Sequence, residues 1–219
     1  MSRFLKDNGL TIVLMLLFVV SIIGQFLTGW HVQNQQLQLH GEQPIGIVAF
    51  LKDPLFLATV FENWESEFLQ MSAYVVLTAF LFQRGSAESA DPDEGAREGD
   101  RRPLKTPADA PAPLHRGALA RWLYSRSLGI VLVILFLASF VMHWVFSAKE
   151  AAAEAASHGQ QTIPTFEYLT SAQLWFESFQ NWQSEFLSTA VIVVLSIFLR
   201  QKGSPESKPV AAPHGQTGV

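Results

Sequence analysis

Residues 10–30 read LTIVLMLLFVVSIIGQFLTGW, 21 residues without a charged side chain. Residues 128–148, LGIVLVILFLASFVMHWVFSA, are equally long and contain a single histidine, His143. A helix needs about 20 predominantly apolar residues to cross the hydrocarbon core of a bilayer. Because neither stretch has a polar face, both are predicted to be transmembrane helices.

Two further apolar runs, which end at Phe82 and Leu199, are too short to cross a membrane by themselves. Each reaches spanning length when the preceding Asn-Trp-x-Ser-Glu stretch is included, which gives spans at about residues 64–83 and 182–201. The tryptophan of each stretch then lies at the membrane–water interface, where tryptophan is favoured. The sequence therefore predicts an all-α integral membrane protein with four transmembrane helices.

The chain is similar to itself at a shift of 118 residues. Residues 3–89 align with residues 121–207 without a gap, and 31 of the 87 aligned positions are identical. NWESEFL (63–69) matches NWQSEFL (181–187), and QRGSAES (83–89) matches QKGSPES (201–207). This similarity predicts two copies of a two-helix unit, the first in residues 1–86 and the second in residues 118–203.

A unit with two spans returns the chain to its starting side, so the two units are expected to be parallel and related by a pseudo-two-fold axis along the membrane normal. The distribution of basic residues predicts their orientation, because loops on the cytoplasmic side are rich in Lys and Arg. Of the 15 Lys and Arg residues, 13 fall on the side of the termini, and only Lys52 and Lys149 fall on the other. We therefore expect both termini in the cytoplasm and an acidic outer face.

The segments outside the spans differ in composition. Residues 87–117 and 204–219 are rich in Pro, Gly, Ala and charged residues, which predicts a disordered cytoplasmic linker and a disordered tail. On the outer side, the strong helix formers before Gly159 predict that the third span continues as a helix to about Ser157, and the first correspondingly to Gly41. The second and fourth spans are expected to end at Gly85 and Gly203.

Composition and motifs exclude several classes of protein. The chain has no cysteine and a net charge of −4, which excludes a disulfide scaffold, a thiolate zinc site and a nucleic-acid binder driven by positive charge. No H-E-x-x-H, G-x-S-x-G or phosphate-binding loop occurs in the sequence. We therefore predict no enzymatic activity, no cofactor and no metal site.

A few polar residues lie near the outer ends of the predicted spans, at depths that would bring neighbouring helices into register. They form one predicted cluster in each unit. The cluster residues are Ser21, Gln25, Asn63, Ser66 and Glu67 in the first unit, and Ser139, His143, Asn181, Ser184 and Glu185 in the second.

Two interpretations of these clusters remain open. Polar residues within a membrane often join helices by hydrogen bonds, each contributing about 0.6–2 kcal/mol. Alternatively, an intramembrane carboxylate marks a functional site. Under that interpretation His143 and Glu185 form the best candidate pair, because histidine titrates near neutral pH.

The repeated NW-[EQ]-SEFL motif, followed by a span and Q-[RK]-GS-x-ES, resembles an uncharacterised bacterial family of small, internally duplicated membrane proteins. The resemblance implies a multi-pass protein of the bacterial inner membrane. We expect a non-enzymatic structural, scaffold or interaction role; the alternative is a small proton or cation carrier that uses Glu67 and Glu185. The expected partners are the lipid bilayer and either a second copy of the chain or another membrane or periplasmic protein.

Overall fold

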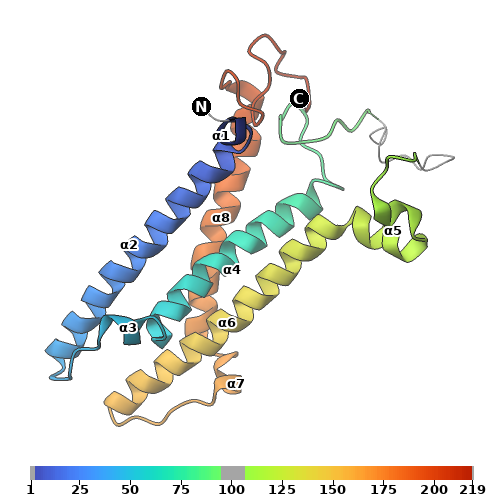
Figure 1. The fold of residues 1–219 in the computed structure, drawn as a ribbon. Coiled ribbons are helices and arrows are strands. Elements are labelled where there is room, and N and C mark those ends of the chain that lie inside the picture. Colours follow the sequence, from blue (N-terminus) through green and yellow to red (C-terminus); the bar gives the residue numbers. More distant parts are fainter. Residues whose placement is uncertain (1–2, 95–106, 219) are drawn as a thin grey trace.

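The computed structural model describes residues 3–94 and 107–218, and every regular element in these residues is helical. Figure 1 shows a body of long helices with short helices at their ends. The long helices are α2 (Gly9–Leu39), α4 (Pro54–Leu77), α6 (Ser127–Ser157) and α8 (Ala172–Phe198). The short helices are α1 (Arg3–Asp7), α3 (Ile47–Phe50), the 3-10 helix η2 (Ala112–His115), α5 (Ala118–Ser125) and α7 (Thr165–Tyr168). The predicted all-helical class is confirmed for this part of the chain.

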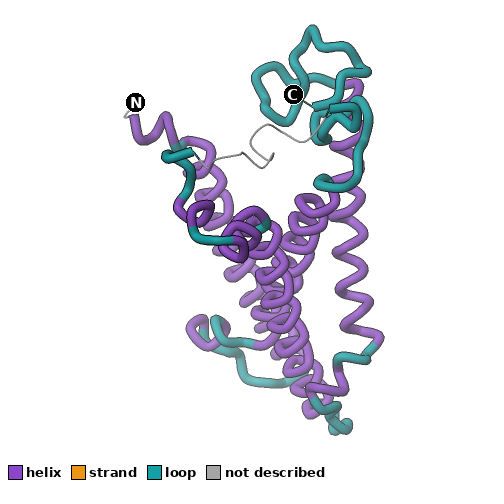
Figure 2. Tube along the Cα trace, turned by 90° about the vertical axis from the view of Figure 1, so that its right-hand side faces the viewer, coloured by secondary structure: helices purple, strands orange, loops and turns teal. Residues whose placement is uncertain are grey.

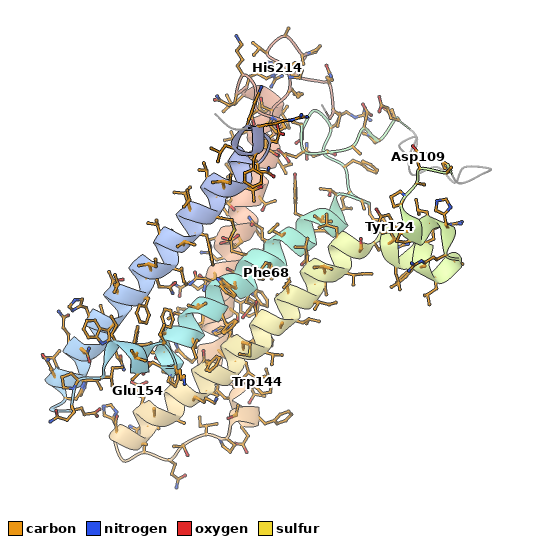
Figure 3. The ribbon with its side chains drawn as sticks, viewed as in Figure 1. Phe68, Asp109, Tyr124, Trp144, Glu154 and His214 are labelled. Carbon is orange, nitrogen blue, oxygen red and sulfur yellow. The ribbon has the colours of Figure 1, made fainter. Side chains whose placement is uncertain are left out.

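The long helices alternate in direction. Helices α2 and α6 begin at the end of the molecule where both chain termini lie, and α4 and α8 run back toward it (Figures 1 and 2). We call this the terminal end, and the opposite end, which holds residues 40–53 and 158–171, the turn end. Figure 3 shows Glu154 at the turn end and His214 at the terminal end. The chain therefore runs in the same direction through residues 9–77 as through residues 127–198.

Three of the described helices, α2, α6 and α8, are long and apolar enough to cross a membrane. Helix α4 has 24 residues, a sufficient length, but three glutamates in its sequence lower its hydropathy. The prediction of membrane-length helices is thus confirmed for three of the four expected spans.

The helix boundaries recur at the spacing of 118 residues. Both bounds of α2 and α6 are related by this shift, as are both bounds of α3 and α7 and the starts of α4 and α8. Below, two residues separated by 118 positions are called equivalent, residues 3–89 are the first half, and residues 121–207 are the second half. The starts of α4 and α8 have side-chain caps, since Asp53 accepts a hydrogen bond from the Leu55 amide and Ser171 accepts one from the Leu174 amide.

The ends of α2 and α6 also share one geometry. Gly41 and Gly159 adopt left-handed backbone conformations, with φ of 73° and 65°. The amide of the following residue donates to a carbonyl five residues earlier, at 2.8 Å in both cases. This is a Schellman motif, in which glycine avoids the penalty of a Cβ atom. The helices therefore extend to Leu39 and Ser157, close to the predicted limits.

Helices α4 and α8 end earlier than predicted. They stop at Leu77 and Phe198 rather than continuing to Gly85 and Gly203. In each half the last serine of the Q-[RK]-GS-x-ES motif accepts a hydrogen bond at 2.9 Å from the backbone amide of the motif's glutamine. Serine side chains that bind nearby backbone groups compete with helix formation. The motif therefore forms a turn, and its glycine is not a helix cap.

The tail, predicted to be disordered, has a described course over residues 204–218. Residues 204–218 form successive turns that fold back on the terminal end of the molecule. Lys208 is buried, and its Nζ donates to the backbone carbonyls of Gly85, His214 and Gln216. Composition predicts too few apolar contacts for order, whereas the tail is held mainly by hydrogen bonds to main-chain carbonyls. Of the predicted linker, residues 95–106 lie outside the described residues, and η2 forms within its remainder.

Two kinds of packing hold the long helices together. Within each half, bulky side chains separate the two long helices, and the equivalent pairs Phe18–Trp64 and Phe136–Trp182 both have ring centroids 6.2 Å apart. Between the halves, α4 packs closely along α6. Buried residues recur every seven positions on α4 (Ala58, Glu65, Ser72), and α6 buries Leu132, Ser139 and His143, at spacings of seven and four positions. The small side chains among them, Ala58, Ser72 and Ser139, allow this close approach.

The two halves contact each other through α4, which packs on α6 and α8, whereas α2 and α8 are apart. A two-fold relation between the halves would place α8 on α2 in the same way as α4 lies on α6. In the part of the chain that the structure describes, α2 and α8 do not pack against each other. Figure 2 shows them diverging toward the terminal end. The pseudo-two-fold relation between the units stays a prediction, and among the described helices α2 and α8 do not repeat the contact between α4 and α6.

Candidate functional site

Three long helices each contribute one ionisable side chain to a buried cluster. His143 on α6 lies between Glu65 on α4 and Glu177 on α8. The distance from His143 Nδ1 to Glu65 Oε2 is 2.6 Å, and that from His143 Nε2 to Glu177 Oε2 is 3.4 Å. Phe68 and Trp144, labelled in Figure 3, mark the neighbourhood of this cluster on α4 and α6. We call these three residues the Glu–His–Glu triad.

The triad is enclosed and its oxygen atoms have further partners. The side chains of Glu65 and His143 are 0% exposed, and that of Glu177 is 25% exposed. Trp182 Nε1 donates to Glu65 Oε1 at 2.9 Å, and Gln173 Nε2 donates to Glu177 Oε1 at 2.7 Å. Buried charges are tolerated when they are paired and hydrogen-bonded, and this network meets both conditions.

A second contact between α4 and α8 lies beside the triad. The Asn181 side-chain amide donates to Glu62 Oε1 and to the Glu177 carbonyl. The polar network thus connects all three helices. It adds Glu62 of α4 to the triad through Asn181 of α8.

The geometry defines the hydrogen-bonding state of His143. A carboxylate only accepts hydrogen bonds, so a ring nitrogen that faces one must carry a proton. Both nitrogens of His143 face carboxyl oxygens, and when both glutamates are ionised only the imidazolium can donate to both. In that state the triad is a charge-assisted bridge, and such hydrogen bonds are about twice as strong as neutral ones.

The first-half residues equivalent to His143 and Glu177 carry no charge. Gln25 is equivalent to His143 and Thr59 to Glu177, and Gln25 Nε2 donates to Thr59 Oγ1 at 3.4 Å. Glu65 is equivalent to Gln183, which is exposed on α8. The same backbone positions thus hold a neutral pair in one half and an ionic pair in the other.

The structure brings together only part of the predicted clusters. The predicted His143–Glu185 pair does not form, because Glu65 and Glu177 occupy both nitrogens of His143. Asn181 joins the network through Glu62, and Ser139 is buried one turn from His143. Gln25 donates a hydrogen bond to Thr59 Oγ1.

The remaining predicted residues lie outside the triad. Ser21, Asn63, Glu67 and Ser184 are exposed, and Glu185 is partly exposed. The side chains of Asn63, Ser66 and Ser184 donate to backbone carbonyls of their own helices. The Glu185 carbonyl accepts from Gln70, which also reaches Ser188 and Thr189 and so fastens α4 to α8.

The sequence interpretation missed Glu65, Glu177, Glu62 and Trp182 as members of the site. It favoured Glu67 and Glu185 because both halves retain them. The residues that contact each other are instead those at which the halves differ together, since His143, Glu65 and Glu177 replace Gln25, Gln183 and Thr59. This joint change is the signal in the sequence that could have located the site.

A cavity of about 360 Å³ lies at the turn end, between the tips of α2 and α6. Its lining includes the equivalent histidines His40 and His158, whose ring centroids are 5.9 Å apart, and the acidic residues Asp53, Glu150 and Glu154. Burial raises the pKa of Asp53 above its usual value, although backbone hydrogen bonds from Leu55 and Phe56 oppose this shift. Within residues 3–94 and 107–218 no three His, Asp or Glu side chains are placed to hold a metal ion.

The fold and the site define an all-helical protein with several membrane-length helices, joined by a buried ionic network. The chain matches the domain of unknown function DUF6766 over residues 1–219 and belongs to that family. No curated protein and no solved structure matches the chain.

Proposed function

We propose that the protein is a non-enzymatic scaffold or interaction protein of the bacterial inner membrane, built from a duplicated two-span unit. The supporting observation is the closure of the Glu–His–Glu triad. Its polar atoms bind one another, Trp182 and Gln173, so the network joins α4, α6 and α8 instead of presenting free ligands. Carriers, by contrast, need an accessible site near the middle of the membrane.

In this proposal α4 also crosses the membrane, as the second of four spans in chain order. Helices α2 and α6 both begin at the terminal end, so a chain that crosses the membrane in α2 must return before α6 begins (Figure 1). Among the described helices between them, α4 alone has the length to do so. Glu62 and Glu65 lie in the half of α4 nearer the turn end, Glu67 lies just past its middle, and Glu65 is paired with His143. The basic terminal end is then cytoplasmic and the acidic turn end is outside.

Cysteine accessibility tests this topology, because the chain has no cysteine of its own. Single variants Gln43→Cys, Glu94→Cys and Gln160→Cys are labelled in intact cells with a membrane-impermeant maleimide. We expect labelling at positions 43 and 160 and protection at 94. Labelling at both 43 and 94 would show that α4 does not cross the membrane.

Ion flux in proteoliposomes separates the scaffold from the carrier. A carrier that uses Glu67 and Glu185 predicts proton or cation flux that falls in the Glu67→Gln/Glu185→Gln variant. The scaffold predicts that vesicles with the wild-type chain leak no faster than empty ones. Flux that depends on the two glutamates would overturn the proposal.

A further inference from the structure

We propose that α2 of one chain packs against α8 of a second copy, and that this contact repeats the contact between α4 and α6 within the chain. The inference concerns the interaction surface and rests on the equivalence of the two halves included in the proposed function. Its partner is a second copy of this chain.

The contact between α4 and α6 provides the template. At its terminal end, a Cβ atom built on Gly129 would lie 3.3 Å from Val76 Cγ2, so the two backbones approach closely. Nearer the turn end, Glu65 pairs with His143, and Phe61 stacks on Phe146 with the ring planes 10° apart. These contacts join α4, which runs toward the terminal end in the first half, to α6, which runs away from it in the second.

Among the residues that the structure describes, the equivalent faces on α8 and α2 have no such partner. On α8 the residues equivalent to Ala58, Glu65 and Ser72 are Phe176, Gln183 and Ala190, and all three are exposed. On α2 the residues equivalent to Leu132 and Ser139 are Leu14 and Ser21, which are also exposed. One chain therefore presents both sides of a second contact of the same kind and leaves both uncovered.

The chemistry of the two faces is complementary. Gln25 and Gln183 take the places of His143 and Glu65. Gln25 uses its amide nitrogen toward Thr59, as His143 uses Nε2 toward Glu177. Its Oε1 accepts no hydrogen bond within the described residues and can accept one from the Gln183 amide. A glutamine pair would thus replace the ionic pair of the template.

Membrane position favours a protein partner over lipid. Ser21, Gln25 and Gln183 lie in or beside the proposed spans, and polar side chains at membrane depth usually face other helices. Small residues at Ser21 and Ala190 also permit close helix packing, as in the template.

A second copy also closes the assembly. An interface between two different faces of the same chain generates either a ring or an open filament. The two halves within a chain do not close on each other, so a ring needs more than two units. Two chains supply four units, the smallest ring that whole chains can form. We therefore expect a dimer in which the contact between α2 and α8 occurs twice.

Disulfide cross-linking of the full chain in membranes tests this contact. The positions equivalent to Gly129 and Val76 are Thr11 and Val194, and the double variant Thr11→Cys/Val194→Cys places a thiol on each face. The matched control, Val13→Cys/Leu195→Cys, lies at the same depth but points the thiols away from both faces. Oxidation is expected to convert most of the first variant, and little of the second, into species of twice the chain mass.

A measurement of the oligomeric state complements the cross-linking. Native mass spectrometry of the wild-type chain in detergent micelles is expected to show the dimer. Equal cross-linking of both variants, a disulfide formed within one chain, or a monomeric wild-type chain would each overturn the inference. Flux and topology results do not enter this test, so its failure is distinguishable from failure of the proposed function.

Discussion

The two halves of this molecule place the same helices at the same spacing, yet they stabilise them with different chemistry. In the first half, Gln25 and Thr59 form a long neutral hydrogen bond between α2 and α4. In the second half, His143 and Glu177 form an ionic contact between α6 and α8, and Glu65 joins it from the other half. The backbone arrangement therefore tolerates either pair, and the ionic version has become the junction between the halves.

This difference indicates which half loses more stability when one partner of its polar pair is removed. A buried ionic pair contributes little net stability when compared with a well-packed apolar substitute, but removing one partner leaves a buried charge. Removing one partner of a neutral pair leaves no buried charge. The second half should consequently be far more sensitive to single substitutions at the equivalent positions than the first.

The largest expected effect follows from replacing His143. His143→Ala leaves Glu65 buried with only Trp182 as a side-chain partner, and should lower the free energy of unfolding by about 3–5 kcal/mol. The matched change Gln25→Ala removes one neutral hydrogen bond and should cost about 1 kcal/mol. Denaturant titration in detergent micelles measures both. Equal losses would mean that the two positions are energetically alike.

A double replacement should recover much of that loss. Glu65→Gln/His143→Gln installs the residues found at Gln183 and Gln25, so no unpaired charge remains at these two positions. The free energy of unfolding of the double variant should exceed, by about 1–3 kcal/mol, the value expected from adding the losses of the two single variants. Strict additivity in the double-mutant cycle would show that Glu65 and His143 are not coupled.

A third comparison concerns the segments after α4 and α8. Lys208 is buried among main-chain carbonyls, whereas its equivalent, Ala90, has no such anchor. Lys208→Ala should weaken the tail locally by about 1.5–3 kcal/mol, the value for a hydrogen bond to a charged group. Amide hydrogen exchange across residues 204–218 should accelerate, with exposed Lys202→Ala as the control. Unchanged exchange would show that the lysine does not hold the tail.

The smallest expected effect distinguishes the two helix caps by pH. Asparagine caps helices as well as aspartate does. Burial raises the folded-state pKa of Asp53, so the folded state binds its proton more tightly, and wild-type stability falls as pH rises through that pKa. Asp53→Asn should therefore be slightly more stable than wild type at pH 7, with the difference shrinking below about pH 4. Ser171→Asn should show no such trend, and a pH-independent difference at Asp53 would contradict the expectation.

Several features of the fold could be predicted from the sequence because they depend on local chemistry. Uninterrupted apolar stretches specified α2 and α6, and Gly41 and Gly159 specified their ends through a conformation that favours glycine. The ends of α4 and α8 were misjudged because the same residue, glycine, serves as a turn residue at Gly85 and Gly203. Which role it plays depends on where the hydroxyls of Ser89 and Ser207 form hydrogen bonds.

The site was predicted only in part. The sequence identified His143 as the candidate of greatest interest and Asn181 as a neighbour, but it selected Glu185 as the partner. Glu65 and Glu67 are two residues apart and face different directions on α4, so periodicity cannot decide which one meets α6. That choice depends on the rotation of α4 about its axis, which is set by packing along its whole length.

By itself, the sequence determined the helical class, the positions of the apolar helices, their alternating direction and the recurrence at 118 residues, since each follows from composition, capping and spacing along the chain. Only the tertiary structure decided that α4 lies on α6 while α2 and α8 stay apart, and hence that His143 meets Glu65 and Glu177. The physical reason is that helix–helix contacts in such a protein depend on which small and polar side chains face each other. A sequence specifies those faces, but it does not state which two of them are in contact.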